Sequence, residues 1–304
     1  MSVRFTPDNT RLVSAGADGT IVMRDVKTGR YIWQRSLDDP SAGMKRSPIA
    51  HLMDMELSPD GKTIAISYWR DRLGDNAVGQ KSDERLVLLD AENGREAKTL
   101  VADDGMPRGV AFSPDGRSLV AVGADRTVRL WGLPEGKEQW TIKLKTRGIS
   151  AAFSADGKLL AIATEAASDA EPVGLYEPET GRLVRSFPPS RRNVGGITFL
   201  SNDVLAISTN DLDGGQIDFW NVGDGKLTKT IKDDIGITFS PDGRLRASSG
   251  ALNDHGVVIV SDVATDRKRA TYRLPADLSA SSFSPDNKTL VVGTEKGQIV
   301  LIGV

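Results

Sequence analysis

One short motif recurs along the whole chain and limits what the chain can fold into. Its clearest copy, Ser113-Pro114-Asp115-Gly116, fits a type I β-turn, because serine suits the first position, proline fixes φ at the second and glycine is favoured at the fourth. Similar turns stand at 6–9, 58–61, 154–157, 240–243 and 284–287, with a degenerate copy at 200–203. Seven turns predict seven copies of one structural unit.

The residues after each turn follow the period of strands and not that of helices. Residues 118–123 form a short apolar run, and Thr127 to Trp131 alternates, with Val128 and Leu130 on one face. Successive turns lie 40 to 55 residues apart, which is enough chain for four short strands per unit. The sequence therefore predicts an all-β fold of repeated sheets.

This repeat resembles the WD-repeat β-propellers. The resemblance is carried by Asp18-Gly19 with Asp25, by Thr127 to Trp131 and by Phe219-Trp220-Asn221, and it extends over essentially all 304 residues. It implies one domain over residues 1–304, a seven-bladed β-propeller of four-stranded antiparallel blades, with strands a to d numbered from the axis outward. No Gly-His pair precedes any unit, so the family's buried His-Ser-Asp-Trp network is not expected here.

Two further predictions concern the number of strands in the last unit and the backbone conformation of the c–d turns. The chain stops after strand c of unit seven, at 298–302, so blade seven should have three strands and an exposed edge. Either this edge is tolerated, or the chain is a fragment whose neighbouring segment completes the blade. Glycine recurs in the c–d reversals, where it would supply a positive φ. These glycines are Gly29, Gly94, Gly136, Gly181 and Gly225.

Strand a of a propeller faces the central channel. The channel-facing residues predicted from the seven units are Arg4, Glu56, Ala111, Ala152, Thr198, Thr238 and Ser282. Two of them are charged, opposite in sign, and belong to neighbouring blades. We expect a structural ion pair between Arg4 and Glu56.

The insertions fall in the b–c and d–a loops, which open on one face of a propeller. Long variable loops on a rigid scaffold are where binding usually occurs, although drift in unconstrained loops is the alternative. The b–c loop predicted at 68–84 contains Trp69, Arg70 and Arg72, and an aromatic beside arginines is typical of interaction hot spots. The d–a loops add Arg108, Arg147 and Arg192. Alternatively, Trp69 packs back on its own blade and the arginines are solvated.

The charge distribution bears on the partner. Units six and seven offer Asp233, Asp234, Asp254 and Asp277, so the face is expected to be basic on one side and acidic on the other. The basic side would suit acidic peptides or phosphate groups. A net charge of −2 argues against a nucleic-acid binder held by bulk electrostatics.

Composition offers little support for catalysis or a cofactor. The chain has no cysteine, no apolar run long enough to cross a membrane and no signal peptide, so we expect a cytoplasmic monomer, with a periplasmic or secreted location left open. His51 and His255 are expected in different loops, without metal-ligand spacing. Asp54 and Glu56 are the only acids on any strand a, and no nucleophile motif occurs. We therefore expect no cofactor, no metal and no enzymatic activity.

The resemblance implies a rigid protein- or peptide-binding scaffold whose loops are held ready by the blades. Two alternatives remain open at this point. The first is a small-molecule-binding or lactonase-like hydrolytic propeller, with Asp54 and Glu56 acting at the channel mouth. The second is the docking or sensing domain of a longer bacterial protein, such as a kinase.

Overall fold

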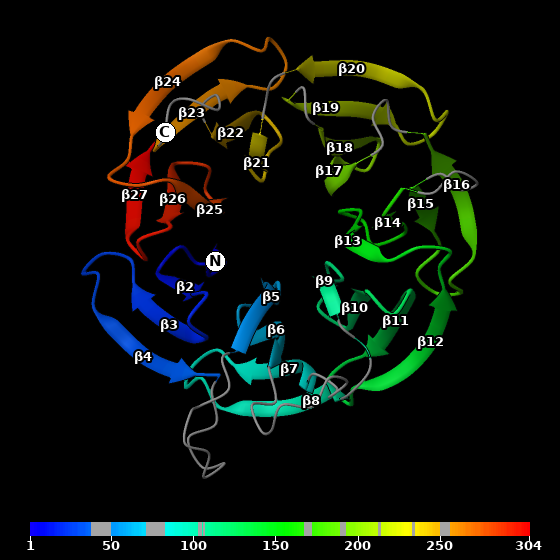
Figure 1. The fold of residues 1–304 in the computed structure, drawn as a ribbon, viewed down its shortest axis with the longest axis horizontal. Coiled ribbons are helices and arrows are strands. Elements are labelled where there is room, and N and C mark those ends of the chain that lie inside the picture. The colour runs from blue at the N-terminus through cyan, green and yellow to red at the C-terminus, as the bar shows by residue number, and fades with distance from the viewer. Residues whose placement is uncertain are drawn as a thin grey trace, which may run out of the picture.

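The structure is a ring of seven antiparallel sheets around an open centre (Figure 1). It is a computed structural model that describes residues 1–37, 50–70, 83–102, 105, 107–166, 172–188, 193–211, 214–232, 235–249 and 256–304. In these ranges every element is a strand, and no helix occurs. The predicted all-β, seven-bladed propeller is confirmed.

Each blade is a meander whose strands follow one another outward from the centre. Blades 1 to 3 comprise β1 (Ser2–Phe5), β2 (Arg11–Ala15), β3 (Thr20–Asp25) and β4 (Tyr31–Ser36); β5 (Ala50–Leu57), β6 (Thr63–Arg70), β7 (Asp83–Asp90) and β8 (Glu96–Ala102); β9 (Pro107–Phe112), β10 (Ser118–Gly123), β11 (Thr127–Gly132) and β12 (Lys137–Lys143). Blades 4 to 7 comprise β13 (Gly148–Phe153), β14 (Leu160–Thr164), β15 (Val173–Tyr176) and β16 (Leu183–Phe187); β17 (Val194–Ser201), β18 (Val204–Asp211), β19 (Gly214–Asn221) and β20 (Leu227–Lys232); β21 (Ile235–Phe239), β22 (Leu245–Ser249), β23 (Val257–Asp262) and β24 (Lys268–Arg273); β25 (Leu278–Phe283), β26 (Thr289–Thr294) and β27 (Ile299–Gly303).

The hydrophobic core lies between neighbouring blades. Both faces of strand b are covered, as in β10, where Leu119 to Val122 are all buried. One cluster joins Val13 and Met23 of blade 1 to Met55 and Ile66 of blade 2. In the described ranges such a cluster lies at each of the seven joints between blades, so a chain with few aromatic residues still buries apolar surface around the whole ring.

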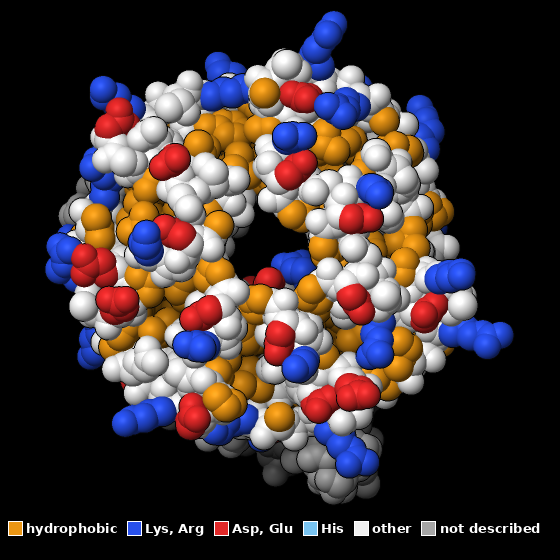
Figure 2. All heavy atoms as spheres, turned by 180° about the vertical axis from the view of Figure 1, so that it is seen from behind, with side chains coloured by type: hydrophobic (Ala, Val, Ile, Leu, Met, Phe, Trp, Pro, Cys, Tyr) orange, Lys and Arg blue, Asp and Glu red, His pale blue; other side chains and the backbone are white. Residues whose placement is uncertain are grey.

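The a–b turns repeat one hydrogen-bond pattern. The Ser113 hydroxyl donates to Asp115 at 2.6 Å and accepts from the Ser118 amide at 2.9 Å. The a–b and c–d connections open on one side of the ring, which we call the turn face, and the b–c and d–a connections open on the other, the loop face. Figure 2 shows the turn face, where acidic and basic side chains alternate around the central hollow.

The c–d reversals follow the glycine prediction. Gly29, Gly94, Gly136, Gly181 and Gly225 all have φ between 64° and 73°. In blade 6 the position is taken by Asp266, with φ of 60°. The predicted positive φ is therefore confirmed at these glycines.

The strands of blade 2 are longer than predicted, which corrects two assignments. β6 continues to Arg70 and pairs with β7 from Asp83, so Trp69 lies in a strand and not in a b–c loop. β5 begins at Ala50, so His51 also lies in a strand. The charged residues around these positions are typical of loops. The strands nevertheless continue through them, because the hydrogen bonds between strands are made by the backbone and form beside polar side chains too.

Blade 7 has three strands in the order β25-β26-β27, as predicted. In Figure 1, β27 is the outermost strand of blade 7, whereas in the other blades the outermost strand is the fourth one. Within the described ranges, no strand pairs with the outer edge of β27.

Candidate functional site

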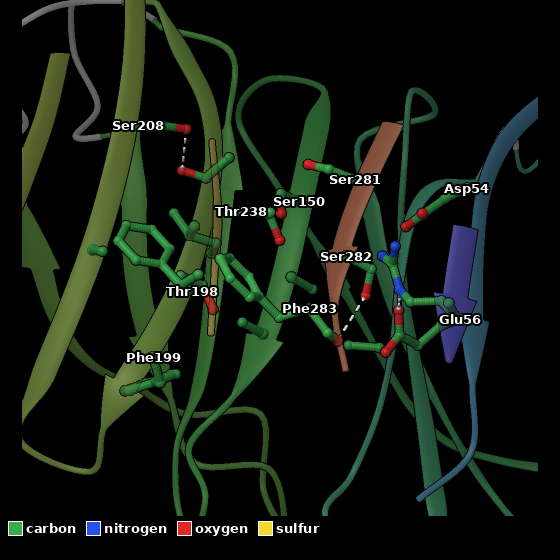
Figure 3. Close-up of a pocket in the computed structure, with 18 of the residues that line it drawn as sticks. Asp54, Glu56, Ser150, Thr198, Phe199, Ser208, Thr238, Ser281, Ser282 and Phe283 are labelled. Carbon is green, nitrogen blue, oxygen red and sulfur yellow. Dashed lines mark hydrogen bonds and ion pairs between the residues drawn. The ribbon is translucent and has the colours of Figure 1, made fainter. Parts of the chain in front are cut away.

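The central channel forms a cavity of about 830 Å³ lined by strand a of every blade. All seven residues predicted to face the channel line this cavity. Five are small or hydroxyl-bearing, and the charged exceptions are Arg4 and Glu56. Figure 3 shows hydroxyl groups such as those of Thr198, Thr238 and Ser282 around the cavity, with Asp54 and Glu56 at one side.

The predicted ion pair between blades 1 and 2 is present. Arg4 Nε donates to Glu56 Oε2 at 3.1 Å, and Arg4 Nη1 donates to the carbonyl oxygen of Val3 at 3.0 Å. Each charged side chain keeps 33% of its surface exposed toward the channel. The pair therefore joins two blades while remaining within reach of molecules in the channel.

Asp54 joins blade 2 to blade 3, which the sequence analysis did not predict. Its Oδ2 accepts a hydrogen bond from the Val110 amide at 3.0 Å, and its Oδ1 accepts one from the Met55 amide at 2.8 Å. Asp54 and Glu56 are two residues apart on β5, so they point to the same side of the strand (Figure 3). The contact of Asp54 with the Val110 amide could not be predicted, because a hydrogen bond to a backbone amide has no sequence signature. The sequence indicated only that Asp54 lies two residues from Glu56 on strand a.

Burial and charge act against each other in this cluster. Burial raises the pKa of Asp54 and of Glu56, and the nearby Arg4 guanidinium only partly offsets this effect. Burial alone would lower the pKa of Arg4, but the Glu56 and Asp54 carboxylates outweigh it and raise that pKa. Such a cluster can hold a polar group, and carboxylates with raised pKa values in a cavity are functional candidates.

On the loop face, Trp69 packs against its own blade. Its ring stacks on the imidazole of His51 with centroids 4.0 Å apart and planes inclined by 15°. The two residues lie opposite each other on β6 and β5, and both are half-buried. This is the packing that the alternative interpretation of Trp69 predicted, although part of the stacked pair stays accessible.

Two of the predicted arginines lie on neighbouring blades of the loop face. Arg108 at the start of β9 forms a 3.0 Å ion pair with Glu165, which follows β14. Arg147 directly precedes β13, and its side chain is exposed. Glu165 also donates its amide to the Arg147 carbonyl at 2.9 Å, so Glu165 brings the two arginine positions together.

The remaining predicted partner residues cannot be placed in the same way. Arg70 ends β6, and its side chain lies outside the described part of the chain. Arg72, Arg192, Asp233, Asp234, Asp254 and His255 also lie outside the described residues. These assignments stay predictions.

Metal-ligating clusters and membrane-spanning helices are both absent from the described part of the chain. No group of three or more His, Cys, Asp or Glu side chains there is arranged to hold a metal ion. The same residues include no helix long and apolar enough to cross a membrane.

Comparison with known protein families confirms the resemblance to WD-repeat propellers. The model of the WD domain, G-beta repeat, matches residues 1–25 and 94–132. These segments contain Asp18-Gly19 with Asp25 and Thr127 to Trp131, which carried the resemblance.

Several curated WD-repeat and related proteins are similar to part of the chain. An uncharacterized WD repeat-containing protein of Synechocystis is 33% identical over 44% of this chain and 32% of its own length. Protein HIR1 of Candida albicans is 28% identical over 43% of this chain and 17% of its own length. A p21-activated protein kinase-interacting protein 1-like of Danio rerio is 25% identical over 38% of this chain and 29% of its own length. The matches thus span a third or less of these relatives.

Proposed function

We propose that this WD-repeat propeller is a non-catalytic scaffold that binds a protein or peptide on its loop face. WD-repeat propellers generally act in protein interactions, and one similar protein is named for its interaction with a kinase. The observation that supports the loop face most is the length of its connections. The longest stretches between successive strands, from Ser36 to Ala50 and from Arg70 to Asp83, join strand ends on this face, while the turn face repeats one hydrogen-bonded turn.

The binding surface would centre on blades 2 to 4. The Trp69–His51 stack offers a rigid, half-buried aromatic surface, which loses little conformational entropy when a partner packs on it. Arg147 offers an exposed guanidinium, and Arg108 offers one that already bridges to Glu165. Arginine binds carboxylate and phosphate groups in a bidentate manner, so the proposed partner is acidic.

Charge reversal tests this proposal. An Arg108→Glu, Arg147→Glu variant should capture the partner at least about tenfold less well than the wild type, because two attractive contacts become repulsive. The measurement is affinity capture from a lysate with crosslinking and mass spectrometry, which identifies both the partner and the residues that contact it.

A matched variant keeps the result specific to one face. Arg117→Glu, Lys158→Glu makes the same change in charge at two exposed positions beside a–b turns of the turn face. It should capture the partner as the wild type does. Equal losses in both variants, or equal capture by the loop-face variant and the wild type, would contradict the proposal.

A further inference from the structure

Neighbouring blades are fastened at the outer rim by one repeated contact, which we call the clasp. In each clasp, a long side chain on strand d of one blade donates a hydrogen bond to a backbone carbonyl at the end of strand c, or in the connection that follows it, of the next blade. The clasps are Trp33 to Ala91, Lys98 to Glu135, Trp140 to Pro178, Arg185 to Asp224, Lys229 to Val263 and Tyr272 to Gly303.

The first five clasps start from the same position of strand d. Each clasp residue lies directly opposite a strand-c residue that is apolar and buried. These pairs are Trp33 with Met23, Lys98 with Leu88, Trp140 with Leu130, Arg185 with Leu175 and Lys229 with Phe219. The five apolar residues are between 0% and 5% exposed, because strand d and its clasp residue cover them.

Leu301 of β27 holds the same position in blade 7, but it is uncovered. Pairing with strand b sets the equivalence, since Val291 lies opposite Leu301 just as Val13 lies opposite Met23. Leu301 is 43% exposed, whereas Met23 is fully buried. The difference follows from the three-stranded sheet of blade 7, which has no strand d in the described ranges.

The other half of the clasp is also present and unfilled. A Cβ atom added to Gly94 in the c–d turn of blade 2 would lie 2.7 Å from the Trp33 ring, whereas one added to Gly29 in blade 1 would meet nothing within 4 Å. Between the c–d turn of blade 1, which contains Gly29, and β27 lies a groove of about 500 Å³. Its lining includes Leu12, Val26, Gly29, Ile299 and Leu301. Blade 1 thus presents a clasp acceptor for which no described residue supplies the donor.

We propose that the edge of β27 binds an extended segment of a partner polypeptide as the fourth strand of blade 7. The segment pairs antiparallel with β27 and places a tryptophan, lysine or arginine opposite Leu301. That side chain lies in the groove and donates a hydrogen bond to a carbonyl of the Val26–Gly29 turn, as Trp33 does to Ala91. This surface is separate from the loop face, so the two proposals stand or fall independently.

The occupant follows from the clasps that the chain already contains. Strand d side chains alternate between exposed and half-buried, as in β4 and β12, so the segment needs an apolar or long-chain residue only at alternate positions. Backbone pairing supplies affinity, and the single clasp position supplies selectivity, as in other cases of strand addition. Exposure of Leu301 beside an unpaired edge is a liability that such a segment would remove.

A synthetic peptide that copies residues 29–37, Gly-Arg-Tyr-Ile-Trp-Gln-Arg-Ser-Leu, serves as the probe. Fluorescence anisotropy should show saturable binding to the wild-type chain. The same peptide with Trp33→Ala should bind at least about tenfold more weakly, as expected when a buried anchor is truncated. A Leu301→Lys variant of the protein should lose at least about tenfold in affinity, because it removes the apolar surface opposite the anchor.

Leu227→Lys is the matched control, since Leu227 on β20 is 44% exposed and lies in blade 5. This variant should bind the probe like the wild type. Hydrogen exchange adds a readout that does not depend on a variant: the amides of residues 299–303 should exchange more slowly when the peptide is added, while those of β20 should not change.

Three results would overturn the proposal. The first is an absence of saturable binding, and the second is protection by the peptide at β3 or on the loop face instead of at β27. The third is a dimer in sedimentation experiments that Leu301→Lys dissociates, because the occupant of the edge would then be a second copy of this chain.

Discussion

The joint between blades 1 and 2 and the joint between blades 7 and 1 connect similar sheets in different ways. The first has a clasp at its outer rim, from Trp33, and an ion pair at the channel, between Arg4 and Glu56. The second has neither among the described residues. It is closed by an apolar cluster that includes Phe5 and Val291, and the Asp286 amide donates a 3.4 Å hydrogen bond to Asn9 Oδ1 between the two a–b turns. The joint between blades 7 and 1 therefore depends mainly on apolar packing of the inner strands, whereas the joint between blades 1 and 2 adds a clasp and an ion pair.

The largest effect is expected at the joint between blades 7 and 1, where the described residues form neither a clasp nor a channel ion pair. Phe5 is 7% exposed, and Phe5→Ala should lower the free energy of unfolding by about 3–4 kcal/mol through lost burial and a cavity. Equilibrium unfolding in urea measures this, with Phe5→Leu as a milder control. A loss below about 1 kcal/mol would show that other contacts close the ring.

The clasp at the joint between blades 1 and 2 should contribute less. Trp33→Ala removes a half-buried ring and the 2.9 Å hydrogen bond to Ala91, so we expect a loss of about 2–3 kcal/mol. Trp33→Phe keeps most of the packing and should lose about 1 kcal/mol. Leu301→Ala, where no strand d covers the side chain, should stay within about 0.5 kcal/mol of the wild type. Equal losses for Trp33→Ala and Leu301→Ala would contradict the difference between the two joints.

Alanine substitutions at Gly29 and Gly94 compare the two joints, because each adds one methyl group at an equivalent turn position. Gly29 and Gly94 have φ of 68° and 71°, so alanine at either position costs about 1 kcal/mol of backbone strain. At Gly94 the new Cβ would also meet the Trp33 ring at 2.7 Å, whereas at Gly29 it would meet nothing within 4 Å. Gly94→Ala should therefore be destabilised by about 1–2 kcal/mol more than Gly29→Ala. Equal melting temperatures of the two variants would indicate that the Trp33 side chain moves aside at no cost.

Much of the fold could be predicted because it is encoded locally. A few neighbouring residues are enough to predict the turn at 113–116 and the alternation after it. The same is true of the channel-facing position of Arg4 and Glu56. The clasps could not be predicted in this way. Trp33 and Lys98 differ in chemistry, and both donate to backbone carbonyls that any residue provides. Likewise, the strand containing Trp69 is continued by backbone pairing that its polar neighbours conceal.

The smallest effect concerns the ion pair and depends on pH. Glu56→Gln should cost about 1 kcal/mol or less near pH 7, because each partner is 33% exposed and solvent screens the pair. Burial raises the pKa of Glu56 in the folded state, so its contribution to stability is full below the unfolded pKa and is lost as pH rises through the folded pKa. The difference in unfolding free energy, wild type minus Glu56→Gln, should therefore fall as pH rises above about 4.

Asp115 in the turn provides a control of opposite sign. Hydrogen bonds from the Ser113 hydroxyl and the Arg117 amide lower the pKa of Asp115, so its contribution is present above the unfolded pKa and is lost as pH falls through the folded one. The difference between wild type and Asp115→Asn should rise with pH over the same range of urea titrations. The joint between blades 7 and 1 has Ser282 in the channel-facing position, so Ser282→Ala should leave the pH profile unchanged. If Glu56→Gln and Asp115→Asn changed the pH profile in the same direction, the pKa of Glu56 would not be raised in the folded protein. The cavity would then lose the property that makes it a candidate functional site, a carboxylate with a raised pKa.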